Sequence, residues 1–167
     1  MKKYLSAIIG AFVLIFIDQY TKILALTHLK DQDPFVIWDG VFELCYLENR
    51  GAAFGILQNQ QIFFLIMTAI VLVAIIFLYK RTPNTRRYLP LRLTAVFITA
   101  GAIGNMIDRI FRGYVVDFFY FSLIDFPIFN VADIYVTVTF FLLAVLLLFY
   151  YKDSELEIYS FRKKKQI

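Results

Sequence analysis

Long hydrophobic stretches alternate with shorter polar segments along the whole chain. Four of the stretches are long enough to cross a membrane, at residues 4–26, 62–79, 91–110 and 134–151. At about 1.5 Å per residue, a helix of each length reaches across a hydrocarbon core of about 30 Å with little or no tilt. We therefore predict an all-α membrane protein with four transmembrane helices, forming a single integral membrane domain over residues 1–167.

The segment between the first two spans, residues 27–61, carries a different pattern. Residues 36–38 and 41–47 are predicted to form two β-strands around an Asp-Gly turn. The segment is too short for a hydrophobic core of its own, so we expect a small extracytoplasmic β-sheet lying at the membrane interface. A short interfacial helix is expected over residues 51–57, where the chain approaches the second span.

Composition and charge support this arrangement and orient it. The chain is 60% hydrophobic with a mean hydropathy of +0.69, more apolar than a soluble domain of 167 residues needs. Twelve of its 17 Lys and Arg lie near the N-terminus, after the second span or after the fourth, and ten of its 13 acids lie in between. The positive-inside rule then places both termini, the loop at 80–92 and the tail at 152–167 in the cytoplasm. Segments 27–61 and 111–132 face outside. Because membrane topology accounts for where the positive charges lie, we expect no nucleic-acid partner.

Polar residues of different spans recur at one depth. Asp18 and Asn105 each lie 14 residues into a span that runs outward, about 21 Å deep at helical rise. Lys22, Asp108 and Arg109 lie one turn further out. We predict an ion pair between Asp18 and Lys22, spaced i and i+4 with the acid first, and a second between Arg109 and Asp108. The third span also carries small residues that permit close helix packing: Ala100, Gly101 and Gly104. The spacing predicts a polar site near the outer face.

Two further carboxylates have no basic neighbour in the sequence. Asp133 stands at the start of the fourth span, where a carboxylate is costly and therefore a functional candidate. Asp117 lies upstream in residues 114–121, a predicted strand. Two carboxylates that meet can share a proton and carry out acid/base chemistry. Simpler roles are a helix N-cap for Asp133 and an exposed loop acid for Asp117. The residues alone do not choose between Asp108, Asp117 and Asp125 as the partner of Asp133.

Other kinds of chemistry find less support. The chain has one cysteine, Cys45, and one histidine, His28, too few for a usual catalytic zinc site, so we predict neither a metal nor a cofactor. The N-terminal apolar run continues through Asp18 and Lys22, which does not fit a cleaved signal peptide. Intramembrane carboxylates also serve transporters and proton relays. That alternative and a purely structural membrane subunit stay open on these observations.

Four motifs resemble those of the lipoprotein signal peptidase (signal peptidase II) family. They are NRGAAF at 49–54, GAIGNMIDR at 101–109, VVDF at 115–118 and FNVAD at 129–133. Asp18 and Lys22 match the first-span pair of that family. The order, the spacing and the frame of four spans agree over nearly the whole chain.

The resemblance implies an aspartic endopeptidase of the bacterial cytoplasmic membrane, with its active site near the outer face. Such an enzyme removes the signal peptide from prolipoproteins just before the diacylglyceryl-modified cysteine. The implied catalytic pair is Asp117 and Asp133. Site-supporting or substrate-binding roles are implied for Asp18, Lys22, Asn49, Gly51, Asn105, Asp108, Arg109 and Asn130. The expected partners are lipidated prolipoproteins and membrane lipid, and we expect a monomer.

Overall fold

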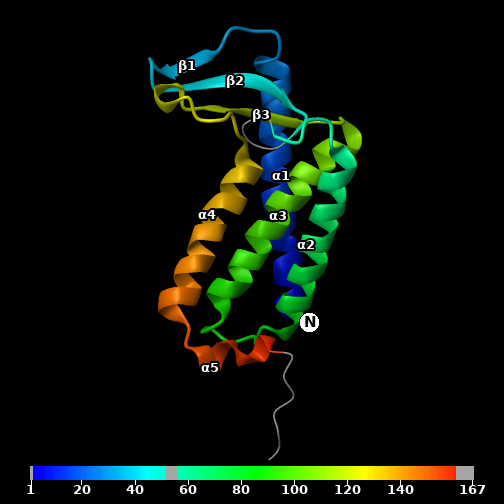
Figure 1. The fold of residues 1–167 in the computed structure, drawn as a ribbon, viewed down its shortest axis with the longest axis vertical. Helices are drawn as coiled ribbons and strands as arrows, with labels where there is room; N and C mark the ends of the chain where they lie inside the picture. Colours follow the sequence, from blue (N-terminus) through cyan, green and yellow to red (C-terminus); the bar gives the residue numbers. More distant parts are fainter. Residues whose placement is uncertain (1, 52–55, 161–167) are drawn as a thin grey trace, which may run out of the picture.

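The computed structural model describes residues 2–51 and 56–160. Four long helices run the length of the molecule (Figure 1): α1 (Lys2–His28), α2 (Gln61–Arg81), α3 (Leu89–Phe111) and α4 (Val131–Val145), which continues as a π-helical turn, η3 (Leu146–Tyr150). All four are long and apolar enough to cross a membrane, and their ends lie within three residues of the predicted ends. The predicted fold class is confirmed.

Helix α3 is the central helix of the bundle and packs against α1, α2 and α4. Its glycines set how closely these neighbours approach. A Cβ atom added at Gly101 would lie 2.6 Å from the carbonyl oxygen of Ala132 in α4, and one added at Gly104 would lie 2.4 Å from Oδ2 of Asp18 in α1. The small residues therefore bring the polar groups of three helices together.

A three-stranded antiparallel sheet crosses one end of the bundle (Figure 1). Its strands are β1 (Phe35–Trp38), β2 (Phe42–Asn49) and β3 (Val115–Tyr120), in that spatial order. The buried residues Val116 and Phe118 of β3 pack with Ala25 near the end of α1. A 3-10 turn, η2 (Ser122–Ile124), follows β3. The predicted strands are confirmed, and β3 pairs with β2, which the sequence did not indicate. Most of the helix expected at 51–57 lies outside the described residues; Ile56 and Leu57 belong to a turn.

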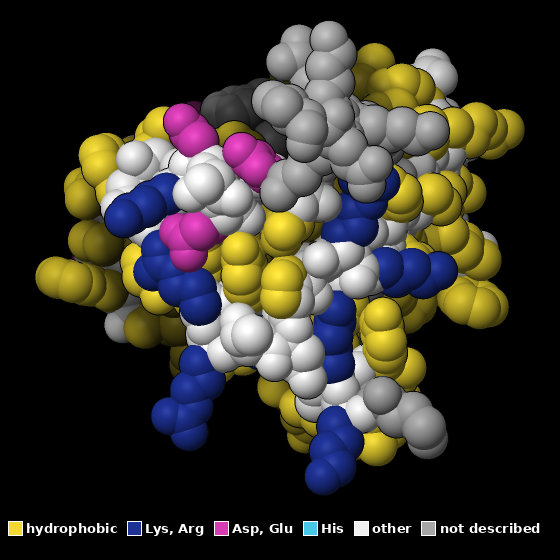
Figure 2. All heavy atoms as spheres, turned by 90° about the horizontal axis from the view of Figure 1, so that it is seen from below, with side chains coloured by type: hydrophobic (Ala, Val, Ile, Leu, Met, Phe, Trp, Pro, Cys, Tyr) yellow, Lys and Arg dark blue, Asp and Glu magenta, His cyan; other side chains and the backbone are white. Residues whose placement is uncertain are grey.

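The opposite end of the bundle is basic. Lys and Arg side chains spread over this face, while its acidic side chains lie together on one side (Figure 2). The chain after α4 folds back as α5 (Asp153–Leu156) and a 3-10 turn, η4 (Glu157–Tyr159). Glu155 accepts a 2.8 Å hydrogen bond from Nε of Arg87, and the hydroxyls of Tyr159 and Thr82 are 2.7 Å apart. These contacts hold the first part of the tail against the α2–α3 loop.

Candidate active site

Asp117 lies in β3 where that strand passes over the ends of the helices. Its side chain is buried, with 1% relative exposure. One carboxyl oxygen accepts a 2.8 Å hydrogen bond from Nδ2 of Asn49 on β2, and the other accepts a 2.5 Å bond from Nδ2 of Asn130. Asp117 is therefore not the exposed loop acid of the simpler interpretation.

Asp133 occupies the first turn of α4. The N-cap of that helix is Asn130 rather than Asp133, so the N-cap interpretation of Asp133 is wrong. The two residues form a reciprocal capping box: Oδ1 of Asn130 accepts a 3.0 Å bond from the Asp133 backbone amide, and Oδ2 of Asp133 accepts a 3.2 Å bond from the Asn130 amide. Nδ2 of Asn105 donates to the other Asp133 oxygen at 2.8 Å. Both oxygens of Asp133 are thus held by the protein.

Asn130 connects the two aspartates, and both line one cavity of about 320 Å³. Among the three candidate partners of Asp133, Asp117 is the carboxylate that lines this cavity. Of the other two candidates, Asp125 is exposed and accepts a 2.8 Å bond from the hydroxyl of Tyr120. Asp108 lies in a buried ion cluster instead.

The cavity combines polar and apolar walls. Its other polar lining includes Asn49, Asn105 and Arg109, and Gly51 also lines it. Its apolar lining includes aromatic side chains from two separate segments: Phe64 of α2, and Phe126 and Phe129 of the connection that leads into α4. A cavity of this kind can hold a polar reacting group while its apolar side contacts a hydrophobic ligand.

The electrostatic setting favours a retained proton. Burial raises the pKa of Asp117, and the nearby charge of Asp133 raises it further. The amide hydrogen bonds from Asn49 and Asn130 act in the opposite direction and are the smaller effects. The pair therefore keeps a proton to a higher pH than isolated carboxyl groups would.

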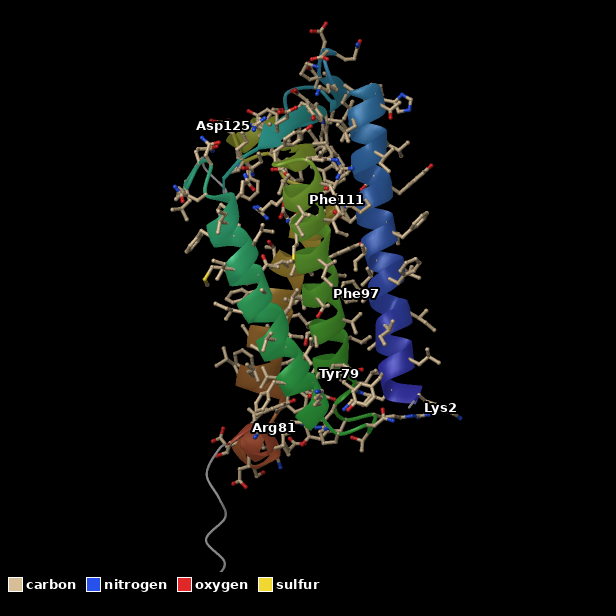
Figure 3. All side chains as sticks on the ribbon, turned by 90° about the vertical axis from the view of Figure 1, so that its right-hand side faces the viewer. Lys2, Tyr79, Arg81, Phe97, Phe111 and Asp125 are labelled. Carbon is tan, nitrogen blue, oxygen red and sulfur yellow. The ribbon has the colours of Figure 1, made fainter. Side chains whose placement is uncertain are left out.

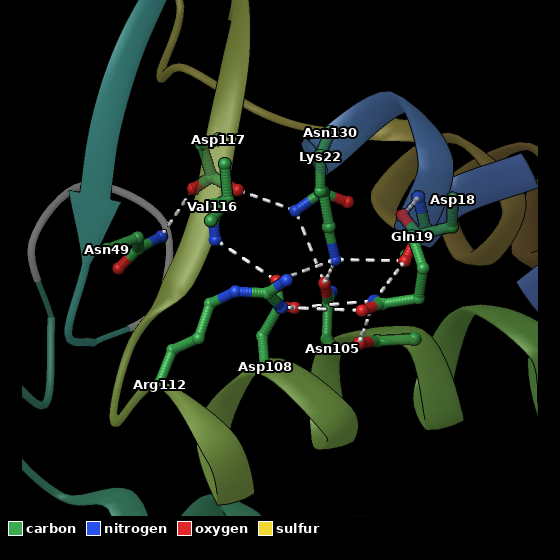
Figure 4. A network of polar contacts seen from close by, with 12 residues as sticks. Asp18, Gln19, Lys22, Asn49, Asn105, Asp108, Arg112, Val116, Asp117 and Asn130 are labelled. Carbon is green, nitrogen blue, oxygen red and sulfur yellow. Dashed lines mark hydrogen bonds and ion pairs between the residues drawn. The ribbon is translucent and has the colours of Figure 1, made fainter. Parts of the chain in front are cut away.

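Beside the cavity, Lys22 forms the centre of an ion cluster in which Lys22, Asp18 and Asp108 are themselves fully buried (Figure 4). Its Nζ lies 3.0 Å from Oδ2 of Asp18 and 3.0 Å from Oδ2 of Asp108, and donates to Oδ1 of Asn105 at 2.8 Å. Oδ1 of Asp18 accepts a 2.9 Å bond from the backbone amide of Ala132 in α4. The predicted Asp18–Lys22 ion pair is confirmed, and it also joins α1 to α3 and α4.

The predicted pair of Asp108 with Arg109 is wrong. Asp108 pairs with Arg112, one helical turn further along α3, and with Lys22. Neighbouring residues on a helix point in different directions, whereas residues i and i+4 share a face. Arg109 instead lines the cavity, donates to the backbone oxygen of Gly51 at 3.3 Å and lies 4.5 Å from the ring centroid of Phe64.

Sequence reasoning missed two members of the cluster, Gln19 and Arg112. Nε2 of Gln19 donates to Oδ2 of Asp18 at 3.1 Å and to the backbone oxygen of Gly104 at 3.1 Å. Arg112 contacts both Gln19 and Asp108. Arg112 could have been found from its i+4 spacing to Asp108, whereas Gln19 carries no comparable signal in the sequence.

Within residues 2–51 and 56–160, no group of three or more His, Cys, Asp or Glu side chains is placed to hold a metal ion.

The fold and the site together define a multi-pass membrane protein with a paired-carboxylate site at one end of its bundle. A family model described as signal peptidase (SPase) II matches residues 10–149. The chain belongs to the signal peptidase II family, a family of proteases.

Named relatives and solved structures agree with this assignment. The lipoprotein signal peptidase of Lactococcus lactis subsp. lactis (strain IL1403) is 45% identical over 149 residues, covering 89% of this chain and 96% of that protein. That of Streptococcus thermophilus (strain CNRZ 1066) is 44% identical over 139 residues, covering 83% and 90%. A structure titled "Bacterial membrane enzyme structure by the in meso method at 2.3 A resolution" is similar with a TM-score of 0.77 and 32% identity, covering 97% of this chain and 94% of that one.

Proposed function

We propose that this protein is a membrane aspartic endopeptidase that removes the signal peptide from diacylglyceryl-modified prolipoproteins. Cleavage falls just before the lipidated cysteine. The observation that carries the proposal is the connection of Asp117 with Asp133 through Asn130, in a cavity lined by both polar and apolar residues. The match to lipoprotein signal peptidases supports the substrate class.

The proposed chemistry uses one ionised and one protonated carboxyl group. The ionised carboxylate takes a proton from a water molecule, whose oxygen attacks the scissile carbonyl carbon. The protonated carboxyl group then donates its proton to the leaving amine as the C–N bond breaks. The raised pKa of Asp117 supports a shared proton at neutral pH. The amides of Asn49, Asn105 and Asn130 hold the carboxyl oxygens in place.

The walls of the cavity suit a lipidated peptide. Arg109 and Gly51 offer polar groups beside the carboxylates, where a peptide backbone would lie. Phe64, Phe126 and Phe129 offer apolar surface for the part of the substrate that carries acyl chains. Because those chains partition into the bilayer, each buried CH₂ adds about 0.8 kcal/mol of anchoring that a peptide alone lacks.

The proposed location is the bacterial cytoplasmic membrane, with both termini in the cytoplasm and the active site near the outer face. The basic end of the bundle supports this orientation. We also propose that the protein is a monomer. The transporter alternative is less well supported, since the fully buried charged side chains of the helices, Asp18, Lys22 and Asp108, lie towards the sheet end and the family is one of proteases.

The test compares one precursor in lipidated and unlipidated forms, each incubated with the purified protein in micelles. We expect cleavage of the lipidated form on the N-terminal side of the modified cysteine, and slow or no cleavage of the unlipidated form. Mass spectrometry of the products locates the cleaved bond. Absence of cleavage in both forms would contradict the enzymatic proposal, and equal rates would contradict recognition through the lipid.

A further inference from the structure

A second cavity opens at the basic end of the bundle, far from the aspartates. It has a volume of about 210 Å³ and lies between α1 and α2, with α3 as its floor. Small side chains create the space, because Ala7 and Ala11 of α1 and Ala95 of α3 leave room that larger residues would fill. The surrounding helices are apolar and exposed, so this crevice opens towards the membrane interior.

Positive and aromatic side chains lie at the mouth of the crevice. Tyr4, Tyr79 and Lys80 line it there. Nζ of Lys3 lies 5.2 Å from the ring centroid of Tyr4 and 5.0 Å from that of Tyr79. The hydroxyl of Tyr79 donates to the backbone oxygen of Lys3 at 3.0 Å, and Figure 3 shows Tyr79 near the start of α1. Tyrosine and lysine at one level are typical of the headgroup region of a bilayer.

Arg92 of α3 supplies a second cation at this end of the bundle. Both side chains are held by the α2–α3 loop: Lys3 donates to the backbone oxygen of Thr82 at 2.5 Å, and Arg92 donates to that of Thr85 at 3.0 Å. Neither forms an ion pair with a carboxylate among the described residues. Arg87 differs, since Glu155 neutralises it. Two cations held by the same loop thus have no carboxylate partner among the described residues.

We propose that this crevice binds an anionic glycerophospholipid from the leaflet at the basic end. The phosphate lies against Lys3 and Arg92, and one acyl chain follows Ala7, Ala11 and Ala95 into the crevice. A guanidinium and an ammonium group both bind phosphate well. A zwitterionic lipid carries its own cation, which the uncompensated positive charge of this site repels. The lipid joins α1, α2 and α3 at the end opposite the active site.

The test titrates the purified protein, in a neutral detergent, with phosphatidylglycerol and with phosphatidylcholine of the same acyl chains. Native mass spectrometry counts the lipid bound at each concentration. We expect the wild type to bind phosphatidylglycerol at least about fivefold more tightly. Lys3→Gln and Arg92→Gln should each weaken that binding by about fivefold, the value of one basic residue near an anionic headgroup, and leave phosphatidylcholine unaffected.

Controls separate a built site from general surface charge. Lys2→Gln and Arg86→Gln remove exposed cations from the same end of the bundle and should change binding less than twofold. Ala95→Leu fills the crevice and should weaken both lipids. Glycerol phosphate, which has no acyl chain, should not displace the lipid. In the wild type, raised salt should reduce the preference for phosphatidylglycerol.

Several results would overturn the proposal. If the wild type bound the two lipids equally, that result alone would contradict the charge argument, and no variant would be needed. Equal losses in Lys2→Gln and Lys3→Gln would show diffuse attraction in place of a site. Displacement by glycerol phosphate would show an anion site without a lipid. A thermal melt of each variant checks folding, and where a variant does not fold, the wild type's preference for phosphatidylglycerol together with the glycerol phosphate competition decides the question.

Discussion

Asn130 has three structural tasks that a single carboxamide can perform together. Its oxygen caps α4 by accepting from the Asp133 amide, while its Nδ2 donates to Asp117 at 2.5 Å and to Oδ1 of Asn105 at 3.2 Å. A carboxylate at this position could accept the first bond but could not donate the others. The chemistry of asparagine thus explains how two aspartates from separate segments are held beside each other.

The buried position of Asp117 predicts a specific pH dependence of stability. Its folded-state pKa is raised above the unfolded value of about 3.9. Between those two values the unfolded chain has lost a proton that the folded protein keeps, so the free energy of unfolding falls as pH rises through this window. Asp117→Asn removes the titration. We expect the melting temperature of the variant minus that of the wild type to increase with pH from about 4 upward, measured in detergent. A difference that stays constant across this range would contradict the raised pKa.

The buried ion pairs of Lys22 predict that removal of this one side chain lowers the stability of the protein. Lys22→Ala leaves the carboxylates of Asp18 and Asp108 buried without their shared cation. Breaking a buried pair costs about 3–5 kcal/mol. The matched control is Lys30→Ala, which breaks the exposed 3.3 Å pair with Glu48 and should cost less than about 1 kcal/mol. Thermal melts of the two variants in the same detergent compare them. Equal melting temperatures would show that the buried cluster does not hold the bundle together.

At the scale of elements, the close crossing of α3 and α4 positions Asn105 against Asp133. Gly101→Ala places a Cβ atom 2.6 Å from the backbone oxygen of Ala132, so the helices must separate. We expect a loss of about 1–3 kcal/mol in stability, as for other overpacked sites, and a loss of cleavage activity as α4 shifts. Gly10→Ala in α1 is the control, because its Cβ would meet Val96 at an ordinary 3.4 Å. If both variants kept wild-type stability and activity, the close crossing would have no such role.

The elements were largely predictable because apolar length and strand alternation are local signals. The four helices and the strands of the sheet follow from them. The pairing of β3 with β2 was not predictable, since it joins residues far apart in sequence. The same limit applied to Asp117: its bonds to Asn49 and Asn130 depend on that pairing and on the position of α4. Arg109 was misassigned because adjacency in sequence was taken for contact on the helix.

For the whole molecule, the charge asymmetry predicts the orientation. In a Cys45→Ser background, Asp39→Cys lies in the hairpin at the sheet end and Asp153→Cys in α5 at the basic end. With both termini in the cytoplasm, a membrane-impermeant maleimide should label the first in intact spheroplasts and the second only after permeabilisation. Labelling in the reverse order would contradict the proposed topology and place the aspartates near the inner face.

The central claim is that Asp117 and Asp133 act together in cleavage, and the most direct measurement compares single-turnover cleavage of one lipidated precursor by four purified proteins. Wild type, Asp117→Asn, Asp133→Asn and the exposed control Asp125→Asn are first shown to be folded by thermal melts. The account predicts a rate loss of at least about 100-fold for each of the first two variants, because an amide can neither take nor donate the required proton. It predicts near wild-type cleavage for Asp125→Asn. Near-normal cleavage by folded Asp117→Asn or Asp133→Asn would contradict the two-aspartate account.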